Sequence, residues 1–138
     1  MTMKPRSAAE IRDKLYLRNW GVRELRFVRE QFSDKLVFDA LFGVFTDESR
    51  PDSRYDDQDL AGKVLLELKP ECHLPLPDVI ARSLPLWDNS VEELPYYLAE
   101  VFGKDAVLKT LAELESSEDL SAELVEKMET YRFWLKGK

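Results

Sequence analysis

The sequence predicts an all-α fold: a single domain, residues 1–138, of about six or seven helices packed as antiparallel helical hairpins. Apolar residues recur at helical spacing, three, four, seven and eight positions apart, along most of the chain. In residues 90–114 two such stripes stand on either side of Gly103, the pattern of a helical hairpin that must bury its apolar face against other helices. No long linker and no strict repeat divides the 138 residues, which suits one domain.

The first helix is predicted from its cap. Ser7 and Glu10 have the Ser-x-x-Glu spacing of a capping box, in which the two side chains satisfy backbone amides that a helix start leaves without partners. The helix that follows would turn Ile11 and Leu15 inward. We expect it to end at Gly21, because glycine suits a left-handed C-terminal cap.

Two further helices are expected before residue 46. The second would turn one apolar side toward the core: Val22, Leu25, Val28 and Phe32. The third would begin after a cap at Ser33 or Asp34 and carry a broad apolar face over residues 36–45. Its β-branched and aromatic residues also permit a strand, but the spacing and the length favour a helix.

Residues 46–59 form the clearest predicted loop, since they combine a proline with many short polar side chains. A helix over residues 58–69 is expected next, and a proline-punctuated segment follows it. Within that segment, Pro77 and Asp78 can open a short helix that reaches Leu84, because proline is tolerated in a first helical turn.

The hairpin at residues 90–114 has one uncertain boundary. Its first helix carries the stripe Leu94, Tyr97, Leu98, Val101 and Phe102, and its second carries Val107, Leu108, Leu111 and Leu114. Ser90 and Glu93 again match a capping box, but a helix begun there places Pro95 one turn inside. The alternative is a helix that begins near Leu94, after a separate turn. A last helix, over residues 120–136, would bury the row Leu124, Met128, Tyr131 and Leu135.

The hairpin pattern of residues 90–114 resembles HEAT-like helical repeats, whose curved surfaces bind other proteins. The resemblance rests on this hairpin alone and matches no diagnostic motif, so we assign no family from it. It implies helical pairs that stack side by side and a function in binding a protein.

The net charge of −7 is unevenly spread along the chain. Residues 1–30 hold eight Lys/Arg and four Asp/Glu, whereas residues 31–138 hold 12 and 23. The acidic majority would repel phosphate-rich partners, so we expect no nucleic-acid partner. A basic protein would be attracted.

Several classes of protein are disfavoured by what the sequence lacks. The lone Cys72 cannot form an internal disulfide, and no Cys/His spacing suggests zinc. The first residues lack the apolar segment of a secretory signal, and no run approaches the roughly 18 apolar residues of a membrane span. We therefore expect a cytoplasmic protein that does not associate with a membrane and binds no cofactor.

Two segments superficially offer chemistry. Glu71, Cys72 and His73 supply an acid, a nucleophile and a base, but sequence neighbours rarely point at one another productively, so we expect no catalytic residue here. The acids of residues 47–59 could chelate a cation. A calcium loop begun at Asp57 places Gly62 correctly but has Leu68 where a bidentate Glu is needed, so we expect no metal site.

Surface features supply the remaining candidates. Arg23, Arg26 and Arg29 lie three apart on the second helix, which is typical of a solvated face with local ion pairs; the alternative is a docking stripe for an acidic surface, including this protein's own. Phe133 and Tyr96 fall off the core stripes of their helices. Either those helices are buried on two sides, or these aromatics anchor an interface together with Trp87.

These observations favour a non-enzymatic protein-binding module, in concrete form an acidic immunity or antitoxin-type protein that covers a basic partner. The candidate contact residues are Asp52, Asp56, Asp57, Asp59, Trp87, Tyr96 and Phe133. One alternative is a small carboxylate- or metal-dependent enzyme with its site in a helical cleft. Another is a homo-oligomer that associates through its C-terminal aromatics.

Overall fold

Helices make up the regular structure in a computed structural model that describes residues 7–117 and 119–137, and these ranges contain no strand. The elements are α1 (Ala8–Tyr16), α2 (Val22–Gln31), α3 (Asp34–Val44), a 3₁₀ turn η1 (Pro51–Ser53), α4 (Arg54–Leu68), α5 (Leu76–Ser83), α6 (Glu93–Phe102), α7 (Lys104–Ser117) and α8 (Ala122–Lys136). The predicted all-α class is confirmed. The described part of the chain holds eight α-helices, more than the six or seven expected.

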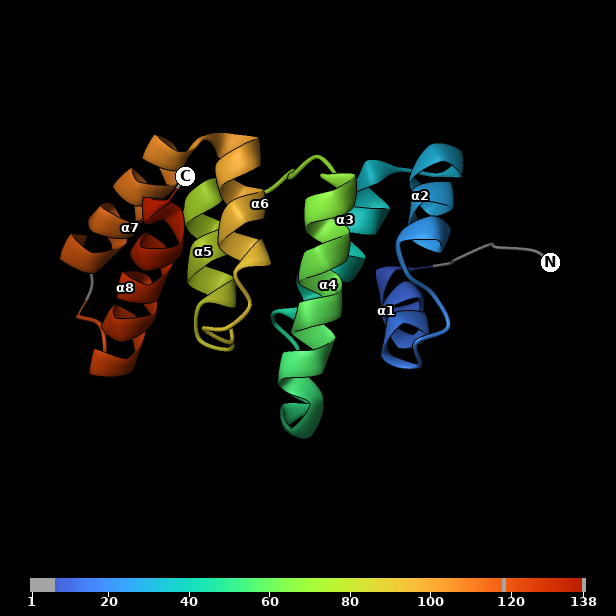
Figure 1. Cartoon of the computed structure of the whole chain (residues 1–138), viewed down its shortest axis with the longest axis horizontal. Coiled ribbons are helices and arrows are strands. Elements are labelled where there is room, and N and C mark those ends of the chain that lie inside the picture. The colour runs from blue at the N-terminus through green and yellow to red at the C-terminus, as the bar shows by residue number, and fades with distance from the viewer. Residues whose placement is uncertain (1–6, 118, 138) are drawn as a thin grey trace.

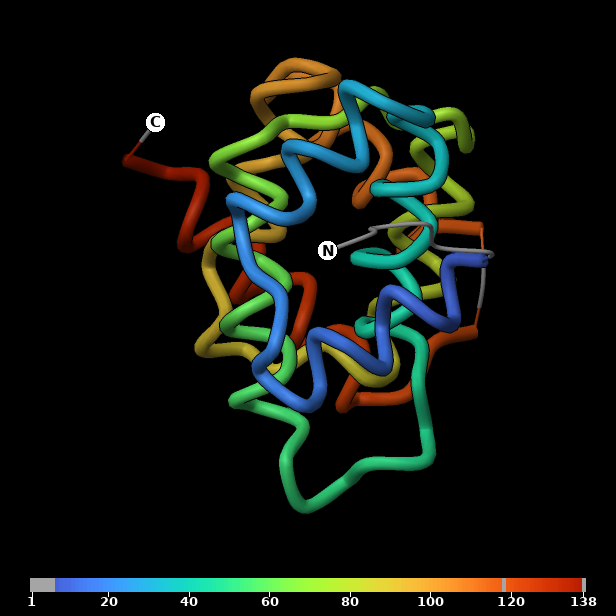
Figure 2. Tube along the Cα trace, turned by 90° about the vertical axis from the view of Figure 1, so that its right-hand side faces the viewer, coloured from blue at the N-terminus to red at the C-terminus, as the bar shows by residue number. Residues whose placement is uncertain are grey.

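The helices follow one another along the long axis, from α1 and α2 at one end to α7 and α8 at the other (Figure 1). Even-numbered helices contact in series, α2 with α4, α4 with α6, and α6 with α8. Among the odd-numbered helices, α1 packs on α3 and α5 on α7. Viewed from the N-terminal end, α2 and α4 lie side by side on the left and α3 lies on the right, packed against both (Figure 2).

Serine caps start three of the helices. The Oγ of Ser7 accepts a hydrogen bond from the Glu10 amide at 3.2 Å, and Ser33 accepts one from Leu36 at 3.0 Å. Ser121 does the same at the start of α8. Each hydroxyl satisfies an amide that has no partner within its own helix, which fixes where the helix begins.

The end of the first helix differs from the prediction. Helix α1 ends at Tyr16 rather than at Gly21, and the left-handed residue beyond it is Arg18, with φ +60°. Gly21 instead precedes α2, where its amide donates to the Glu24 carboxylate at 2.8 Å.

Helix α4 begins four residues earlier than predicted, at Arg54, and shortens the expected loop. The sequence signal was weak because residues 54–57 are polar and carry no apolar stripe. The carboxylates of Asp56 and Asp57 lie in the first turn, where they interact favourably with the positive end of the helix dipole.

The predicted hairpin is α6 and α7, which pack against each other. Helix α6 begins at Glu93 with Pro95 in its first turn, where a missing amide hydrogen costs nothing, and a turn at Asp88–Val91 precedes it. Gly103 separates the two helices with φ +95°. Most of the apolar stripe is buried as predicted, but Val101 is 37% exposed.

One core runs through all eight helices, and its largest fully buried side chains include Trp87, Tyr97, Tyr131 and Phe38. The indole of Trp87 donates to the Val91 carbonyl at 2.9 Å and lies 4.7 Å from the Tyr131 ring. The predicted rows on α1, α3 and α8 are largely buried, whereas Phe32 of the α2 stripe is exposed. No helix in the described ranges combines the length and the apolar character that crossing a bilayer requires.

We predict that Gly103→Ala destabilises the protein by about 1–2 kcal/mol, because a Cβ strains a backbone with positive φ. A Cβ at this position meets no atom within 4 Å, so the cost is conformational and not steric. Gly137→Ala is the control, since that glycine has an ordinary φ of −85° and open space around it. Urea denaturation measures both variants; equal stability of the two would contradict the prediction.

Candidate functional site

The four predicted acidic contact residues lie in different environments. Asp52 and Asp56 are exposed, and Asp59 is half-buried, with its carboxylate 2.7 Å from Lys63 Nζ. Asp57 is 4% exposed and holds two arginines of its own chain. Its carboxylate therefore faces inward, and three of the four acids remain accessible to a partner.

The three predicted aromatic contact residues also differ in their exposure to solvent. Trp87 is 1% exposed and belongs to the core, which removes it from any surface that a partner could touch. Tyr96 is half-buried at the edge of the core, on α6. Phe133 is 65% exposed on α8, with its ring 5.2 Å from that of Trp134.

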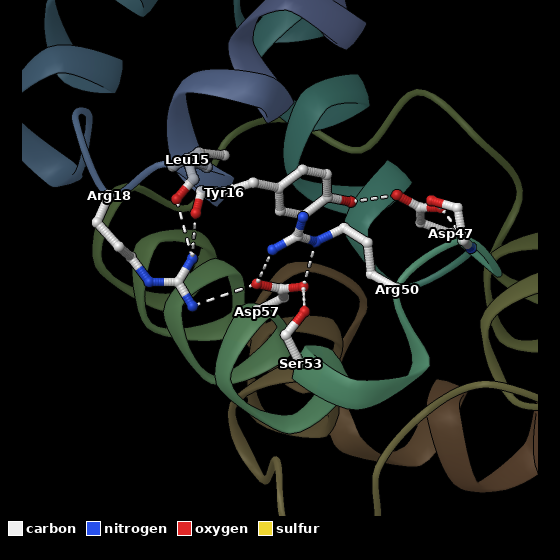
Figure 3. Close-up of polar contacts among 8 residues, drawn as sticks. Leu15, Tyr16, Arg18, Asp47, Arg50, Ser53 and Asp57 are labelled. Carbon is white, nitrogen blue, oxygen red and sulfur yellow. Dashed lines mark hydrogen bonds and ion pairs between the residues drawn. The ribbon is translucent and has the colours of Figure 1, made fainter.

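Asp57 lies at the centre of a polar network that joins the end of α1 to α4 (Figure 3). Arg18 donates to its Oδ1 at 3.2 Å, and Arg50 donates to its Oδ2 at 2.8 Å. Ser53 also donates to Oδ2, at 2.8 Å. Arg18 in addition donates to the Leu15 carbonyl at 3.0 Å, so the network closes the C-terminal end of α1.

A second carboxylate extends this network along the loop before α4. Asp47 accepts the phenolic hydroxyl of Tyr16 at 2.6 Å and both the amide and the hydroxyl of Ser49 (Figure 3). The Arg50 guanidinium lies 4.1 Å from the centre of the Tyr16 ring, within the range of a cation–π interaction. The loop is thus tied to α1 at two points.

The ionisation of these groups follows from their partners. Burial alone would raise the pKa of Asp57, but hydrogen bonds from Arg50, Ser53 and Arg18 offset it and hold the pKa below its ordinary value. The pKa of Asp47 is lowered in the same way by Ser49 and Tyr16. Both carboxylates are charged at neutral pH, and the contacts described here bind them to side chains and backbone groups of the protein itself.

One group of acids, some exposed and some half-buried, lies along one side of α4 and α6. We name this surface the α4–α6 acidic face and define it by Asp56, Asp59, Lys63, Glu67, Glu93, Tyr96 and Glu100. The residues on α4 are spaced i, i+3, i+7 and i+11, and those on α6 are spaced i, i+3 and i+7, so each set follows one side of its helix. Sequence spacing could have revealed both stripes, but not that the two helices are neighbours.

The stripe on α4 and the stripe on α6 meet where the two helices contact each other. Lys63, Glu67 and Glu93 line one shallow hollow of about 370 Å³. Burial raises the pKa of Glu93, and the carboxylates of Asp59 and Glu92 raise it further. Gly62 permits this proximity, since a Cβ there would lie 3.0 Å from the Cβ of Glu93. Five carboxylates and one lysine therefore share the face, and a second lysine, Lys69, lies at its edge with its Nζ 4.0 Å from Glu100 Oε2.

A larger hollow, of about 800 Å³, opens among α1, α3, α5 and the segments that flank α4. Its lining includes two arginines, Arg12 and Arg82, together with Asp39, Asp47 and His73. His73 Nε2 lies 2.6 Å from Asp39 Oδ1, and Lys35 Nζ lies 2.8 Å from Oδ2. Sequence reasoning missed this group because Asp39 and His73 stand 34 positions apart.

Cys72 does not join His73 in this hollow. Its thiol donates to the Leu74 carbonyl at 3.5 Å, and burial raises the pKa of the thiol above its ordinary value. A protonated, half-buried thiol is a poor nucleophile. No group of three or more His, Cys, Asp or Glu side chains within residues 7–117 and 119–137 is arranged to hold a metal ion.

The arginines predicted to lie on a solvated face of α2 are used in different ways. Arg23 is largely exposed and pairs with Glu24 at 2.9 Å. Arg29 points inward, donates to the Leu68 carbonyl at the end of α4 and lies 3.7 Å from Asp34. Part of the basic N-terminal segment therefore docks within the molecule.

Comparisons of the chain with models of protein families, with curated proteins and with solved structures find no match.

We predict that Asp57→Asn destabilises the protein by about 2 kcal/mol, because charge-assisted hydrogen bonds from two arginines are lost at a buried position. Both arginines reach solvent, which keeps the loss below that of a fully buried pair. Asp56→Asn, at the exposed neighbouring position, should change stability by less than about 0.5 kcal/mol. Equal effects at the two positions, measured by urea denaturation, would refute the role assigned to Asp57.

The same carboxylate predicts a pH dependence. Its pKa is lower in the folded protein than in the unfolded chain, so its stabilisation is complete above the unfolded value of about 3.9 and is lost as the pH falls through the folded value. The difference in unfolding free energy between the wild type and Asp57→Asn should be constant from about pH 5 to 7 and shrink below about pH 4. Denaturation curves at stepped pH test this; a gap that widens in acid would contradict it.

Proposed function

We propose that this protein is a non-enzymatic protein-binding module that covers a basic partner, in the manner of an immunity or antitoxin protein, and that the α4–α6 acidic face is its contact surface. The observation that carries the proposal is the continuity of that face. Two stripes of carboxylates run along adjacent, contacting helices and meet at the hollow that Glu67 and Glu93 share.

The sequence segment that contains the α4–α6 acidic face is itself acidic, which strengthens the negative potential around the face. Residues 46–100 carry 13 Asp/Glu and five Lys/Arg. Two of those arginines lie close to acids or to the core: Arg50 pairs with Asp57, and Arg54 has its Nε buried. The lysine of the face, Lys63, is paired with Asp59, and Lys69 at its edge is paired with Glu100. Such a surface steers a basic protein toward it and accelerates the encounter.

Aromatic side chains border the face and suit the role of anchors. Tyr96 lies within it, half-buried, and Tyr55 is 47% exposed one position before Asp56. Tyrosine contributes both an apolar ring and a hydroxyl, which is why it is enriched in the energetically dominant parts of interfaces. Of the seven residues predicted from sequence, the proposal keeps Asp56, Asp59 and Tyr96 as central contacts.

The arrangement of the helices supports the proposal at the level of architecture. The serial contact of α2, α4, α6 and α8 and the packing of α3 on α4 and of α7 on α8 are two features that stacked HEAT-like pairs share. Stacked helices present their outer sides together, which suits the recognition of a protein. We infer a cytoplasmic location as well, because the free thiol of Cys72 suits a reducing compartment.

The test neutralises three exposed acids of the face together: Asp56→Asn, Glu67→Gln and Glu100→Gln. A matched control, Asp13→Asn, Glu30→Gln and Glu113→Gln, changes the net charge equally at exposed positions outside the face. With a basic protein captured from cells by the wild type, association should slow about tenfold or more at low salt for the face variant and less than about twofold for the control.

Salt dependence provides the second readout. Association of the wild type should slow steeply as ionic strength rises, and the face variant should lose most of that dependence. Equal slowing by the two triple variants, or a rate insensitive to salt, would count against the α4–α6 acidic face as the contact surface.

A further inference from the structure

The hollow of about 800 Å³ lies apart from the α4–α6 acidic face and is lined from α1, α3 and α5 and from the segments before and after α4. Its volume falls within the range of pockets that bind small molecules. It also contains His73, the one histidine of the chain. The proposed binding of a protein makes no use of this hollow.

The acids that line the hollow are already engaged by the protein. Each oxygen of Asp39 has a partner, His73 at one and Lys35 at the other. Each oxygen of Asp47 likewise accepts a hydrogen bond, from Tyr16 or from Ser49. The remaining acid, Glu48, is exposed at the rim.

The two arginines of the hollow, in contrast, have N–H groups that donate no hydrogen bond to a described residue. Arg12 donates one hydrogen bond, to the Asp39 carbonyl at 3.2 Å, and pairs with no carboxylate within 4 Å in the part of the chain that the structure describes. Arg82, held 5.7 Å from the centre of the Phe42 ring, forms no ion pair with any described residue. A guanidinium carries five N–H donors, so each of these two arginines has several donors that no described residue accepts.

Arg12 is also positioned by a glycine. Its guanidinium lies directly over Gly43 of α3, where a Cβ would collide with it. The absence of a side chain at Gly43 leaves the space that the guanidinium fills beside Asp39 and His73. A guanidinium that forms no ion pair within 4 Å with any described residue, although its charge acts on the nearby Asp47 carboxylate, is thus held in place in the hollow.

From these observations we infer that the hollow binds a small molecule through an oxyanion, a phosphate or a carboxylate group, which the guanidinium groups of Arg12 and Arg82 hold. Planar guanidinium groups form paired, charge-assisted hydrogen bonds with either group. The carboxylates of Asp47 and Glu48 disfavour long polyanions such as nucleic acid, so a small ligand with one such group fits best.

The test is an NMR titration of the full chain with inorganic phosphate and, separately, with acetate, each against chloride at matched ionic strength. Saturable shifts of the Gly43 amide and of the Arg12 and Arg82 Nε–H signals are expected with at least one of the two anions. Tighter binding of phosphate identifies a phosphate ligand, and tighter binding of acetate identifies a carboxylate. Absence of saturable shifts with both anions would overturn the inference.

Variants separate this site from general electrostatics. Arg82→Gln should weaken binding about tenfold, and Arg82→Lys should weaken it less, since lysine keeps the charge but loses the planar donor pair. Arg23→Gln removes the same charge from an exposed position on α2 and should leave affinity unchanged. Equal weakening by Arg82→Gln and Arg23→Gln would show that the anion binds by net charge alone and would overturn the site.

Gly43→Ala provides a variant that retains every charge. The new methyl group must displace the Arg12 guanidinium, so affinity should fall although the net charge is unchanged. The fold is checked by far-ultraviolet circular dichroism. A folded Gly43→Ala protein that binds the anion as tightly as the wild type would contradict the assigned role of Arg12.

Discussion

The Asp57 carboxylate is the constraint on which the arrangement of the N-terminal half depends. A carboxylate that is 4% exposed is costly to bury unless it is compensated, and the compensation comes from two arginines on different segments. Meeting that need fixes Arg18 beyond α1 and Arg50 in the loop before α4. Since α4 in turn packs on α1, α2, α3 and α6, the geometry of one ion network is transmitted to half of the helices.

The same network accounts for the way in which charge is divided between inside and outside. Arginines of the basic N-terminal segment are used within the molecule: Arg18 on a carboxylate, and Arg12 and Arg29 on backbone carbonyls. Apart from Asp57, the acids of α4 and α6 lie at or near the surface, where Asp59 pairs with Lys63 and Glu100 with Lys69. Five carboxylates thereby lie together along α4 and α6.

The sequence specified the helices better than it specified the sites. Periodicity and serine caps are local signals, and they located the starts of α1 and α3 and the break at Gly103. The interactions of Asp57 were invisible, because the carboxylate reads as part of a polar loop and its partner Arg18 lies 39 positions away. Trp87 failed as a surface candidate for a related reason, since only packing by α8 decides that it is buried.

Gly62 gives the clearest case of an uncharged residue that sets an electrostatic property. Its missing side chain lets α4 lie close to the start of α6, where a Cβ would be 3.0 Å from the Cβ of Glu93, and so contributes to the close spacing of the two rows of carboxylates. Coulomb energy varies inversely with that spacing, and screening by salt sharpens the dependence over a Debye length of about 8 Å. The close approach of the two backbones at Gly62 therefore affects the electrostatic potential at the surface. A bulky side chain at this position would move the two rows of carboxylates apart and weaken that potential without altering a single charge.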